Sequence, residues 1–202
     1  MASRYSSNSD KEYINYHSPI PLEDEENVYR PPLKKRHFGN NLVFCYFKDQ
    51  PLFNIGPDWR YFLFSFFGIE LMGIFVYFII APSQPLFVKL LILGLIVLDG
   101  CVFLYTGLRN PGIASAVNPS DPKLEELEMY SNFCKRCRVL RDESTYHCDK
   151  CDVCIKGYDH HCPWTGKCIG VNNFKAFYTF ICVTFIHFAV CIILLVRNVS
   201  NE

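Results

Sequence analysis

The sequence predicts a multi-pass α-helical membrane protein that carries a loop-rich, cysteine-rich domain between its second and third membrane spans. Three apolar runs, at residues 61–80, 86–108 and 177–196, are each long enough to cross a bilayer, which takes about 20 helical residues. Seven of the 11 cysteines and three of the six histidines lie within residues 134–168. The soluble core of a 202-residue chain could not cover three such runs, so we interpret them as transmembrane helices.

The residues before the first run divide into a polar tail and a short hairpin. Residues 1–36 are rich in Ser, Asn, Asp, Glu and Pro, which predicts a disordered cytosolic tail. The tail ends in a basic cluster that fits a solvated linker and a contact with anionic lipid headgroups equally well, made up of Arg30, Lys34, Lys35 and Arg36. Residues 37–60 hold two runs of strand-forming residues around a polar break, and these predict a hairpin at the membrane surface.

The distribution of Lys and Arg predicts the orientation in the membrane. Basic residues precede the first apolar run and follow the second, whereas residues 81–85 carry no charge. The positive-inside rule therefore places the N-terminus, a linker at residues 109–131 and the cysteine-rich domain at residues 132–176 in the cytosol, with a short lumenal tail at residues 197–202. The cytosol keeps thiols reduced, and residues 1–30 contain no apolar stretch of a signal peptide,. Metal binding is therefore favoured over a disulfide scaffold.

Three polar side chains interrupt the apolar runs. Glu70 and Asp99 lie near the middle of the first and second runs. Carboxyl groups within a bilayer are candidate functional groups, but a protonated or hydrogen-bonded pair that locks these two helices together is the favoured interpretation. For His187 in the third run, we expect a packing histidine with satisfied hydrogen bonds.

The cysteine-rich segment contains ten candidate metal ligands, at CxxC and related spacings. Zinc takes four thiolate or imidazole ligands in a tetrahedron, so two sites use eight ligands and two are left over, and spacing alone does not say which two. The run Asp159-His160-His161-Cys162 suggests a chemical answer. Cys162 can act as a nucleophile, His160 as its base, and Asp159 as the carboxylate that orients the base.

These residues also carry a resemblance. The cysteine-rich block, its Asp-His-His-Cys run, Pro163-Trp164, Cys168 and the following residues Ile169-Gly170, Asn173 and Phe177 resemble the DHHC family of protein S-acyltransferases (palmitoyltransferases). A weaker resemblance covers residues 39–58, which end in Ile55-Gly56-Pro57-Asp58, and relates this segment to the Golgi and Ras-modifying branch of that family.

The resemblance implies two structural zinc ions, each held by three cysteines and one histidine. The first set is Cys134, Cys137, His147 and Cys154, and the second set is Cys148, Cys151, His161 and Cys168. It also implies that Cys162 is acylated by a fatty acyl-CoA such as palmitoyl-CoA, with His160 and Asp159 assisting. The acyl group would then pass to a membrane-proximal cysteine of a cytosolic or membrane-associated substrate protein. An endomembrane location (Golgi, endoplasmic reticulum or plasma membrane) follows from the same resemblance.

The sequence departs from the family pattern at several points. Family members usually have four or more membrane helices and a Thr-Thr-x-Glu segment, whereas residues 1–202 contain three apolar runs and no such segment. A truncated gene model, a short isoform and a degenerate paralogue all fit this difference, and an oligomer or accessory subunit could complete the bundle. Asn110-Pro111-Gly112 replaces Asp-Pro-Gly, and Lys167 replaces an asparagine.

Two other functions remain as alternatives. One is a catalytically inactive or truncated membrane protein whose zinc module only binds partners. The other is a nucleic-acid-binding zinc module, which ranks far behind because the formal net charge of the chain is zero,.

Overall fold

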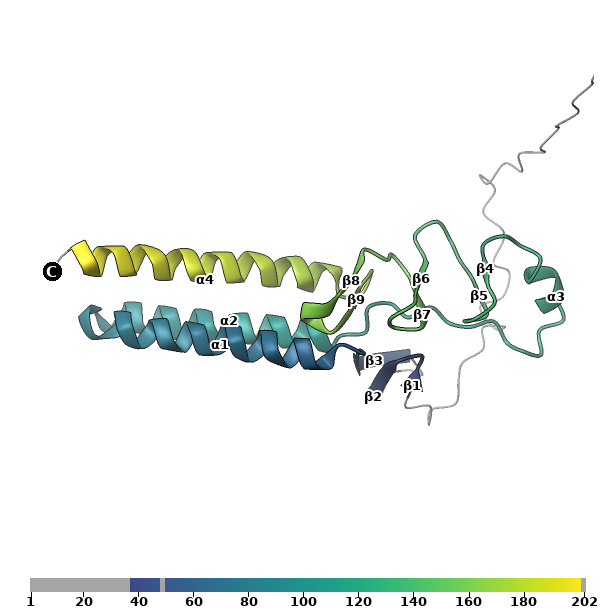
Figure 1. Cartoon of the computed structure of the whole chain (residues 1–202), viewed down its shortest axis with the longest axis horizontal. Coiled ribbons are helices and arrows are strands. Elements are labelled where there is room, and N and C mark those ends of the chain that lie inside the picture. The colour runs from purple at the N-terminus through teal and green to yellow at the C-terminus, as the bar shows by residue number, and fades with distance from the viewer. Residues whose placement is uncertain (1–36, 48–49, 201–202) are drawn as a thin grey trace, which may run out of the picture.

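Three long helices lie side by side, and the remaining structure extends from one end of them (Figure 1). A computed structural model describes residues 37–47 and 50–200, so the predicted tail at residues 1–36 lies outside the described residues. The long helices are α1 (Trp59–Ile80), α2 (Leu86–Leu108) and α4 (Phe174–Ser200), and the short 3-10 helix η2 (Ala81–Ser83) joins the first two. All three helices are long and apolar enough to cross a membrane.

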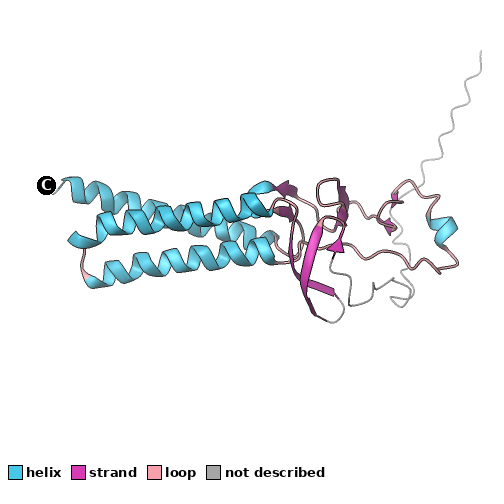
Figure 2. Cartoon of the chain, turned by 60° about the horizontal axis from the view of Figure 1, so that its bottom comes forward, coloured by secondary structure: helices cyan, strands magenta, loops and turns pink. Residues whose placement is uncertain are grey.

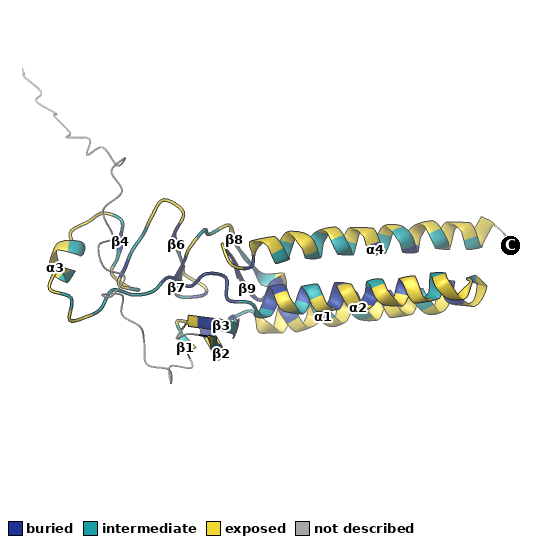
Figure 3. Cartoon of the chain, turned by 180° about the vertical axis from the view of Figure 1, so that it is seen from behind, coloured by how far each residue is buried: buried dark blue, intermediate teal, exposed yellow. Residues whose placement is uncertain are grey.

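The outer faces of these helices are exposed and apolar, as expected for helices surrounded by lipid (Figure 3). Their mean hydropathies are 2.2, 2.5 and 2.7 in chain order. α4 begins three residues before the apolar run at residues 177–196 and ends four residues after it. The apolar run marks only the part that hydrocarbon would surround, and the helix continues into its polar flanks because no Pro or Gly interrupts residues 171–200,.

Buried polar side chains join α2 to α4 inside the bundle. Asp99 is fully buried. The hydroxyl of Thr184 donates to one of its carboxylate oxygens (2.6 Å), and Nδ1 of His187 lies 3.2 Å from the other. Both of these contacts of Asp99 go to α4, and no hydrogen bond joins Asp99 to Glu70 among the described residues. Glu70 instead lies over Gly100, where a Cβ atom would come within 2.7 Å of its Oε1.

His187 only partly meets the expectation of a satisfied packing histidine. It is almost completely buried, and its Nδ1 has a partner in Asp99. Its Nε2 has no hydrogen-bond partner among the described residues.

A small antiparallel sheet precedes α1. Its strands are β1 (His37–Phe38), β2 (Asn41–Phe47) and β3 (Gln50–Ile55), in the order β1-β2-β3. The hairpin of β2 and β3 matches the predicted one, and β1 is an addition. Gly39 forms the β1–β2 turn with φ 53°, and a Cβ atom there would clash with the backbone oxygens of Cys151 and Asp152. The turn therefore packs directly against the cysteine-rich domain.

The cysteine-rich domain consists of three short antiparallel hairpins (Figure 2). They are β4 (Phe133–Cys134) with β5 (Val139–Leu140), β6 (Tyr146–Cys148) with β7 (Val153–Ile155), and β8 (His160–Cys162) with β9 (Lys167–Ile169). The β8–β9 hairpin lies nearest to the helix ends, and β4–β5 lies farthest away (Figure 1). Strands of two or three residues bury little apolar surface, so the domain needs another source of stability.

The predicted linker at residues 109–131 packs along the hairpins over its first half. The backbone N–H of Ala114 donates to Cys154 (2.8 Å), and that of Val117 donates to Arg138 (2.7 Å). Ile113 forms an isolated bridge with Ile155 and joins its buried cluster. The short helix α3 (Leu124–Leu127) follows. These backbone hydrogen bonds make the first half of the segment part of the domain.

Candidate metal centres and catalytic hairpin

Two CxxC turns supply the first ligands of each candidate metal centre. Cys134 and Cys137 lie at the β4–β5 turn, and Cys148 and Cys151 lie at the β6–β7 turn. In each hairpin the residue directly after the second cysteine has a positive φ, 54° at Arg138 and 55° at Asp152. This left-handed conformation is uncommon for residues other than glycine, and here it brings the chain back into the returning strand.

The first cluster joins the β4–β5 hairpin to the β6–β7 hairpin. Nδ1 of His147 lies 3.7, 3.2 and 3.9 Å from the sulfur atoms of Cys134, Cys137 and Cys154, respectively. His147 and Cys154 are cross-strand partners in β6 and β7, so both side chains leave the same face of that hairpin. All four ligand atoms lie within 4.8 Å of one another.

The second cluster joins the β6–β7 hairpin to the β8–β9 hairpin. Nδ1 of His161 lies 3.4, 3.4 and 3.6 Å from the sulfur atoms of Cys148, Cys151 and Cys168, respectively. His161 and Cys168 are again cross-strand partners. The structure therefore brings together the same two sets of four residues that the resemblance implies, in an interleaved order along the chain.

The geometry of both clusters fits a tetrahedral zinc ion. Zinc–sulfur bonds of about 2.3 Å and zinc–nitrogen bonds of about 2.0 Å place sulfur and nitrogen ligands about 3.5 Å apart in a tetrahedron. The observed distances between Nδ1 and sulfur, 3.2–3.9 Å, bracket that value. Three sulfur atoms with one imidazole are a donor set that zinc favours over harder cations such as magnesium.

Hydrogen bonds among the clustered sulfur atoms lower the pKa of Cys137 and Cys148, toward the thiolate form that binds metal, and raise the pKa of Cys154 and Cys168,. The Cys154 sulfur, aided by His147, lowers the pKa of Cys137 to about 6. Hydrogen bonds to the sulfur atoms of Cys148 and Cys151, together with one to Asp58, raise the pKa of His161 to about 10.

The alternation of side chains along β8 separates the metal ligand from the candidate catalytic residues. Successive residues of a strand point to opposite faces. His161 belongs to the second cluster, so His160 and Cys162 lie on the other face of the hairpin. Nδ1 of His160 lies 2.9 Å from a carboxylate oxygen of Asp159, and Cys162 is buried, with 5% of its surface exposed. No hydrogen bond joins the described side chains of His160 and Cys162. Catalytic hydrogen bonds of this kind often form fully only in the complex with substrate.

Comparison with known proteins finds relatives of the segment that contains the two metal clusters and β8. Residues 127–202 match the family model described as DHHC palmitoyltransferase. Over this segment the chain is similar to DHHC palmitoyltransferases. The chain is 34% identical over 110 residues to palmitoyltransferase akr1 of Schizosaccharomyces pombe, and this match covers 50% of this chain and 17% of that protein.

Two vertebrate relatives give similar matches. Identity is 33% over 113 residues to palmitoyltransferase ZDHHC18-B of Danio rerio, covering 54% of this chain and 29% of that protein. Identity is 27% over 129 residues to palmitoyltransferase ZDHHC9 of Homo sapiens, and the match covers 50% of this chain and 34% of that protein. The chain therefore spans about a third or less of the length of these curated relatives. Each of them is named as a palmitoyltransferase, which is an acyltransferase.

The cysteine-rich domain, called the DHHC domain from here on, makes contacts with residues outside the matched segment at residues 127–202. Sequence reasoning did not identify these residues as functional. Nε2 of His161 lies 2.9 Å from a carboxylate oxygen of Asp58, at the start of α1. Nζ of Lys167 donates to the backbone oxygen and to Oδ1 of Asn54, at 2.7 and 2.6 Å. Lys167 is fully buried, and burial lowers its pKa well below the usual range,. The motif that ends in Asp58 and the unusual Lys167 were the only sequence signals of these contacts.

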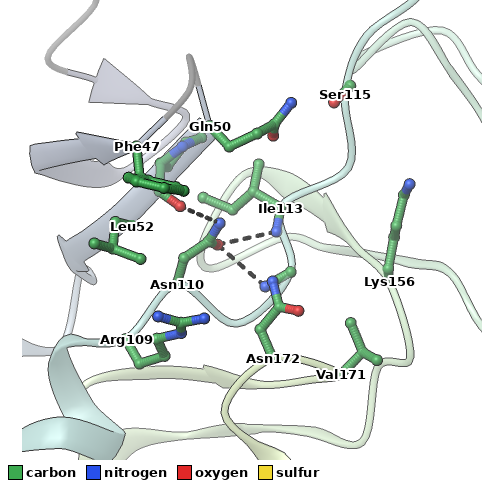
Figure 4. Close-up of a pocket in the computed structure, with 12 residues that line it drawn as sticks. Phe47, Gln50, Leu52, Arg109, Asn110, Ile113, Ser115, Lys156, Val171 and Asn172 are labelled. Carbon is green, nitrogen blue, oxygen red and sulfur yellow. Dashed lines mark hydrogen bonds between the residues drawn. The ribbon is translucent and has the colours of Figure 1, made fainter. Parts of the chain in front are cut away.

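A cavity of about 500 Å³ lies between the DHHC domain, the N-terminal sheet and the end of α2. Asn110, from the Asn-Pro-Gly sequence, holds its wall together (Figure 4). Its Oδ1 accepts hydrogen bonds from the backbone N–H groups of Gly112 and Ile113, both at 3.1 Å, and its Nδ2 donates to the backbone oxygen of Pro51 at 2.7 Å. None of the candidate catalytic residues lines this cavity.

Proposed function

We propose that this protein is a protein S-palmitoyltransferase in which Cys162 carries the acyl group. The main support is the β8 strand, which directs His161 into a metal cluster and leaves His160 and Cys162 on the opposite face. Asp159 contacts the ring of His160. A nucleophile, a base and an orienting carboxylate thus occur within one short hairpin.

Two acyl transfers make up the proposed reaction. In the first, His160 takes the thiol proton of Cys162, and the thiolate attacks the thioester carbonyl of a long-chain fatty acyl-CoA. The new carbon–sulfur bond forms on Cys162, the bond to CoA breaks, and the CoA thiolate receives the proton. In the second, His160 takes the thiol proton of a substrate cysteine, and the substrate thiolate attacks the acyl carbonyl carried by Cys162. The bond to Cys162 then breaks, and the Cys162 thiolate receives the proton from His160. Each transfer exchanges one thioester for another, so positioning and proton transfer are the main requirements.

Asp159 has a defined part in this scheme. Its carboxylate oxygen faces Nδ1 of His160 at 2.9 Å, so it accepts a hydrogen bond from the Nδ1–H group. That bond favours the tautomer whose Nε2 is free to accept a proton.

The two metal clusters would hold two structural zinc ions. Each cluster provides four protein ligands, which leaves no open position for water. Their role is to hold three short hairpins in place beside the membrane helices. We further propose that the DHHC domain faces the cytosol in an endomembrane compartment, where fatty acyl-CoA and membrane-proximal substrate cysteines are both accessible.

Labelling of the purified protein tests the proposal. The protein in detergent is incubated with radiolabelled palmitoyl-CoA, and the label that hydroxylamine releases is measured together with zinc content. We expect wild-type protein to be labelled and Cys162→Ser to lose the hydroxylamine-sensitive label while it keeps its zinc. Cys45→Ser, which changes a half-buried cysteine of β2, is the matched control and should keep the label. Unlabelled wild-type protein with intact zinc would contradict the proposal.

A further inference from the structure

Two of the residues next to Cys162 in the β8–β9 hairpin are held from outside the DHHC domain. His161 precedes it in the chain, and Lys167 is its cross-strand partner in β9. Directly opposed residues of an antiparallel pair have Cβ atoms about 5 Å apart on the same face. The positions of His161 and Lys167 therefore determine where the Cys162 side chain can lie.

One short segment before α1 contacts both of these neighbours. Asn54 accepts two hydrogen bonds from the side-chain amino group of Lys167. Asp58 accepts the hydrogen bond of the His161 ring nitrogen that is not directed at the sulfur atoms. These partners are separated by 113 and 103 residues in the chain, respectively. The two contacts are thus tertiary contacts on either side of Cys162.

The backbone of this segment also packs tightly on the hairpin. The N–H group of Asp58 donates to the backbone oxygen of Gly166 at 3.1 Å. A Cβ atom on Gly56 would clash with that same oxygen and with the Cβ atom of Lys167. Only glycine therefore allows this close approach of the segment to the hairpin.

The contacts of Asn54 continue into the N-terminal sheet and the second metal cluster. Nδ2 of Asn54 donates to Oδ1 of Asn41 at 3.2 Å, and Nδ2 of Asn41 donates to the backbone oxygen of Cys151 at 3.0 Å. Asn41, Asn54 and Lys167 are all almost completely buried. Buried polar groups that satisfy one another in this way make a rigid connection.

We propose that Asn54 and Asp58 are positioning residues for Cys162, which they hold at a fixed place relative to the start of α1 through Lys167 and His161. This inference rests on the proposed role of Cys162 as nucleophile. α1 begins at Trp59, the residue after Asp58, so the segment links the membrane helix directly to the hairpin. Asn54 and Asp58 then belong to the catalytic module, although they lie outside the matched segment at residues 127–202.

Kinetic measurements on folded variants test the Asn54 contact. Asn54→Ala, Lys167→Met and the double variant are compared by zinc content and by the rate of Cys162 acylation over a range of palmitoyl-CoA concentrations. We expect two zinc ions per chain and an unchanged half-saturating concentration. The acylation rate at saturation should fall by about 100-fold, the cost of a displacement of roughly 1 Å at a reacting atom. The double variant should be no slower than the slower single variant, because both changes remove one contact.

Asn54→Asp provides a conservative variant in case Asn54→Ala does not fold. It keeps the oxygen that accepts from Lys167 and should retain a rate closer to that of wild type. Lys123→Met, an exposed lysine in the same chain, is the matched control and should acylate at the wild-type rate. Wild-type rates in folded Asn54→Ala or Lys167→Met, or rate losses that simply add in the double variant, would overturn the proposal.

A readout that does not depend on acyl transfer tests Asp58. Removal of a carboxylate that orders a metal-bound histidine typically weakens metal affinity 10–100-fold. Asp58→Ala should therefore lower the affinity for one of the two zinc ions by about that factor and leave the affinity for the other unchanged. The control Glu143→Ala, at an exposed position of the domain, should retain both affinities. Unchanged affinities in Asp58→Ala would contradict the role of Asp58.

Alkylation separates failure of this inference from failure of the proposed function. The rate of iodoacetamide modification at Cys162, resolved by peptide mass spectrometry, should differ from wild type in Asp58→Ala and Lys167→Met but not in the two control variants. If wild-type protein takes no acyl group and these alkylation rates still change, the positioning role stands and the acyltransferase proposal fails.

Discussion

His147 and His161 each direct Nδ1 at three sulfur atoms, but their second ring nitrogens have different surroundings. Nε2 of His161 contacts Asp58 at 2.9 Å. Nε2 of His147 lies 3.6 and 3.7 Å from Asp149 and Asp152 and has no hydrogen-bond partner among the described residues. Because such a partner orients the ring of a metal-binding histidine, the orientation of His161 in the second cluster is fixed by a hydrogen bond that His147 lacks in the described structure.

At the residue scale, His160 and Asp159 should have unequal effects on acylation. His160→Ala removes the proposed base, and we expect the rate of Cys162 acylation to fall by about 10²–10⁴-fold, the usual contribution of a general base. Asp159→Asn keeps the base but removes the charged acceptor, so its loss should be smaller. Stopped assays with labelled palmitoyl-CoA measure both rates. His37→Ala, an exposed histidine of β1, should have no effect, and an equal rate in His160→Ala would rule out the base assignment.

The asparagine at residue 110 also leads to a prediction. Asn110→Asp would introduce the aspartate of the Asp-Pro-Gly pattern but would place a carboxylate against the backbone oxygen of Pro51, which now accepts from Nδ2. We expect a loss of about 1–3 kcal/mol in the free energy of unfolding, the cost of an unpaired buried polar group. Asn118→Asp is the matched control, because Asn118 only accepts, from Ser120. An unchanged thermal midpoint of Asn110→Asp would contradict this account.

At the scale of elements, the β6–β7 hairpin is shared by both metal clusters. His147 and Cys154 serve the first cluster, whereas Cys148 and Cys151 serve the second. Adjacent residues of a strand point in opposite directions, so the neighbours His147 and Cys148 reach different clusters. The same rule separates His161 from His160 and Cys162 in β8. Two-residue periodicity thus assigns neighbouring residues to different roles.

The polar contacts between α2 and α4 are testable at the same scale. Asp99→Ala removes the acceptor of both Thr184 and His187. We expect it to destabilise the helix bundle by about 1–2 kcal/mol, in the range of interhelical hydrogen bonds in membranes. Unfolding by denaturing detergent measures the change. Leu98→Ala, on the exposed side of α2, should have little effect, and a Leu98→Ala loss as large as that of Asp99→Ala would argue against the hydrogen bonds as the cause.

At the scale of the whole molecule, two clusters connect three hairpins in series, and the last hairpin is attached to the helix ends and the N-terminal sheet. The hairpins themselves contain strands of only two or three residues. Bound metal would therefore supply much of the folding free energy of this domain. The three long helices satisfy their backbone hydrogen bonds internally and do not depend on the clusters.

Metal removal should therefore unfold one part of the molecule and spare the other. After chelation, we expect rapid amide hydrogen exchange across residues 133–169, with slow exchange retained in α1, α2 and α4. Cys148→Ala, which removes a ligand of the second cluster, should have the same effect on the β8–β9 hairpin without a chelator. Full protection of the hairpins in metal-free protein would show that the metals are not structural.

The limits of sequence reasoning can be seen at particular residues. Hydropathy predicted the three long helices, because about 20 apolar residues have few other stable environments. The resemblance implied both ligand sets, which the structure brings together. The partners of Asp99 could not be predicted, because hydropathy identifies helices but not the faces on which they meet.

The sequence alone was sufficient to predict membrane helices, the cysteine-rich domain and the Asp-His-His-Cys run, because length, composition and local spacing carry that information. Only the tertiary structure brought Asn54 and Asp58 to the β8–β9 hairpin, across 113 and 103 residues of chain. The burial of Lys167 and the place of Cys162 beside α1 depend on that arrangement. Such contacts between distant segments are determined by how whole elements pack, which no local pattern of residues records.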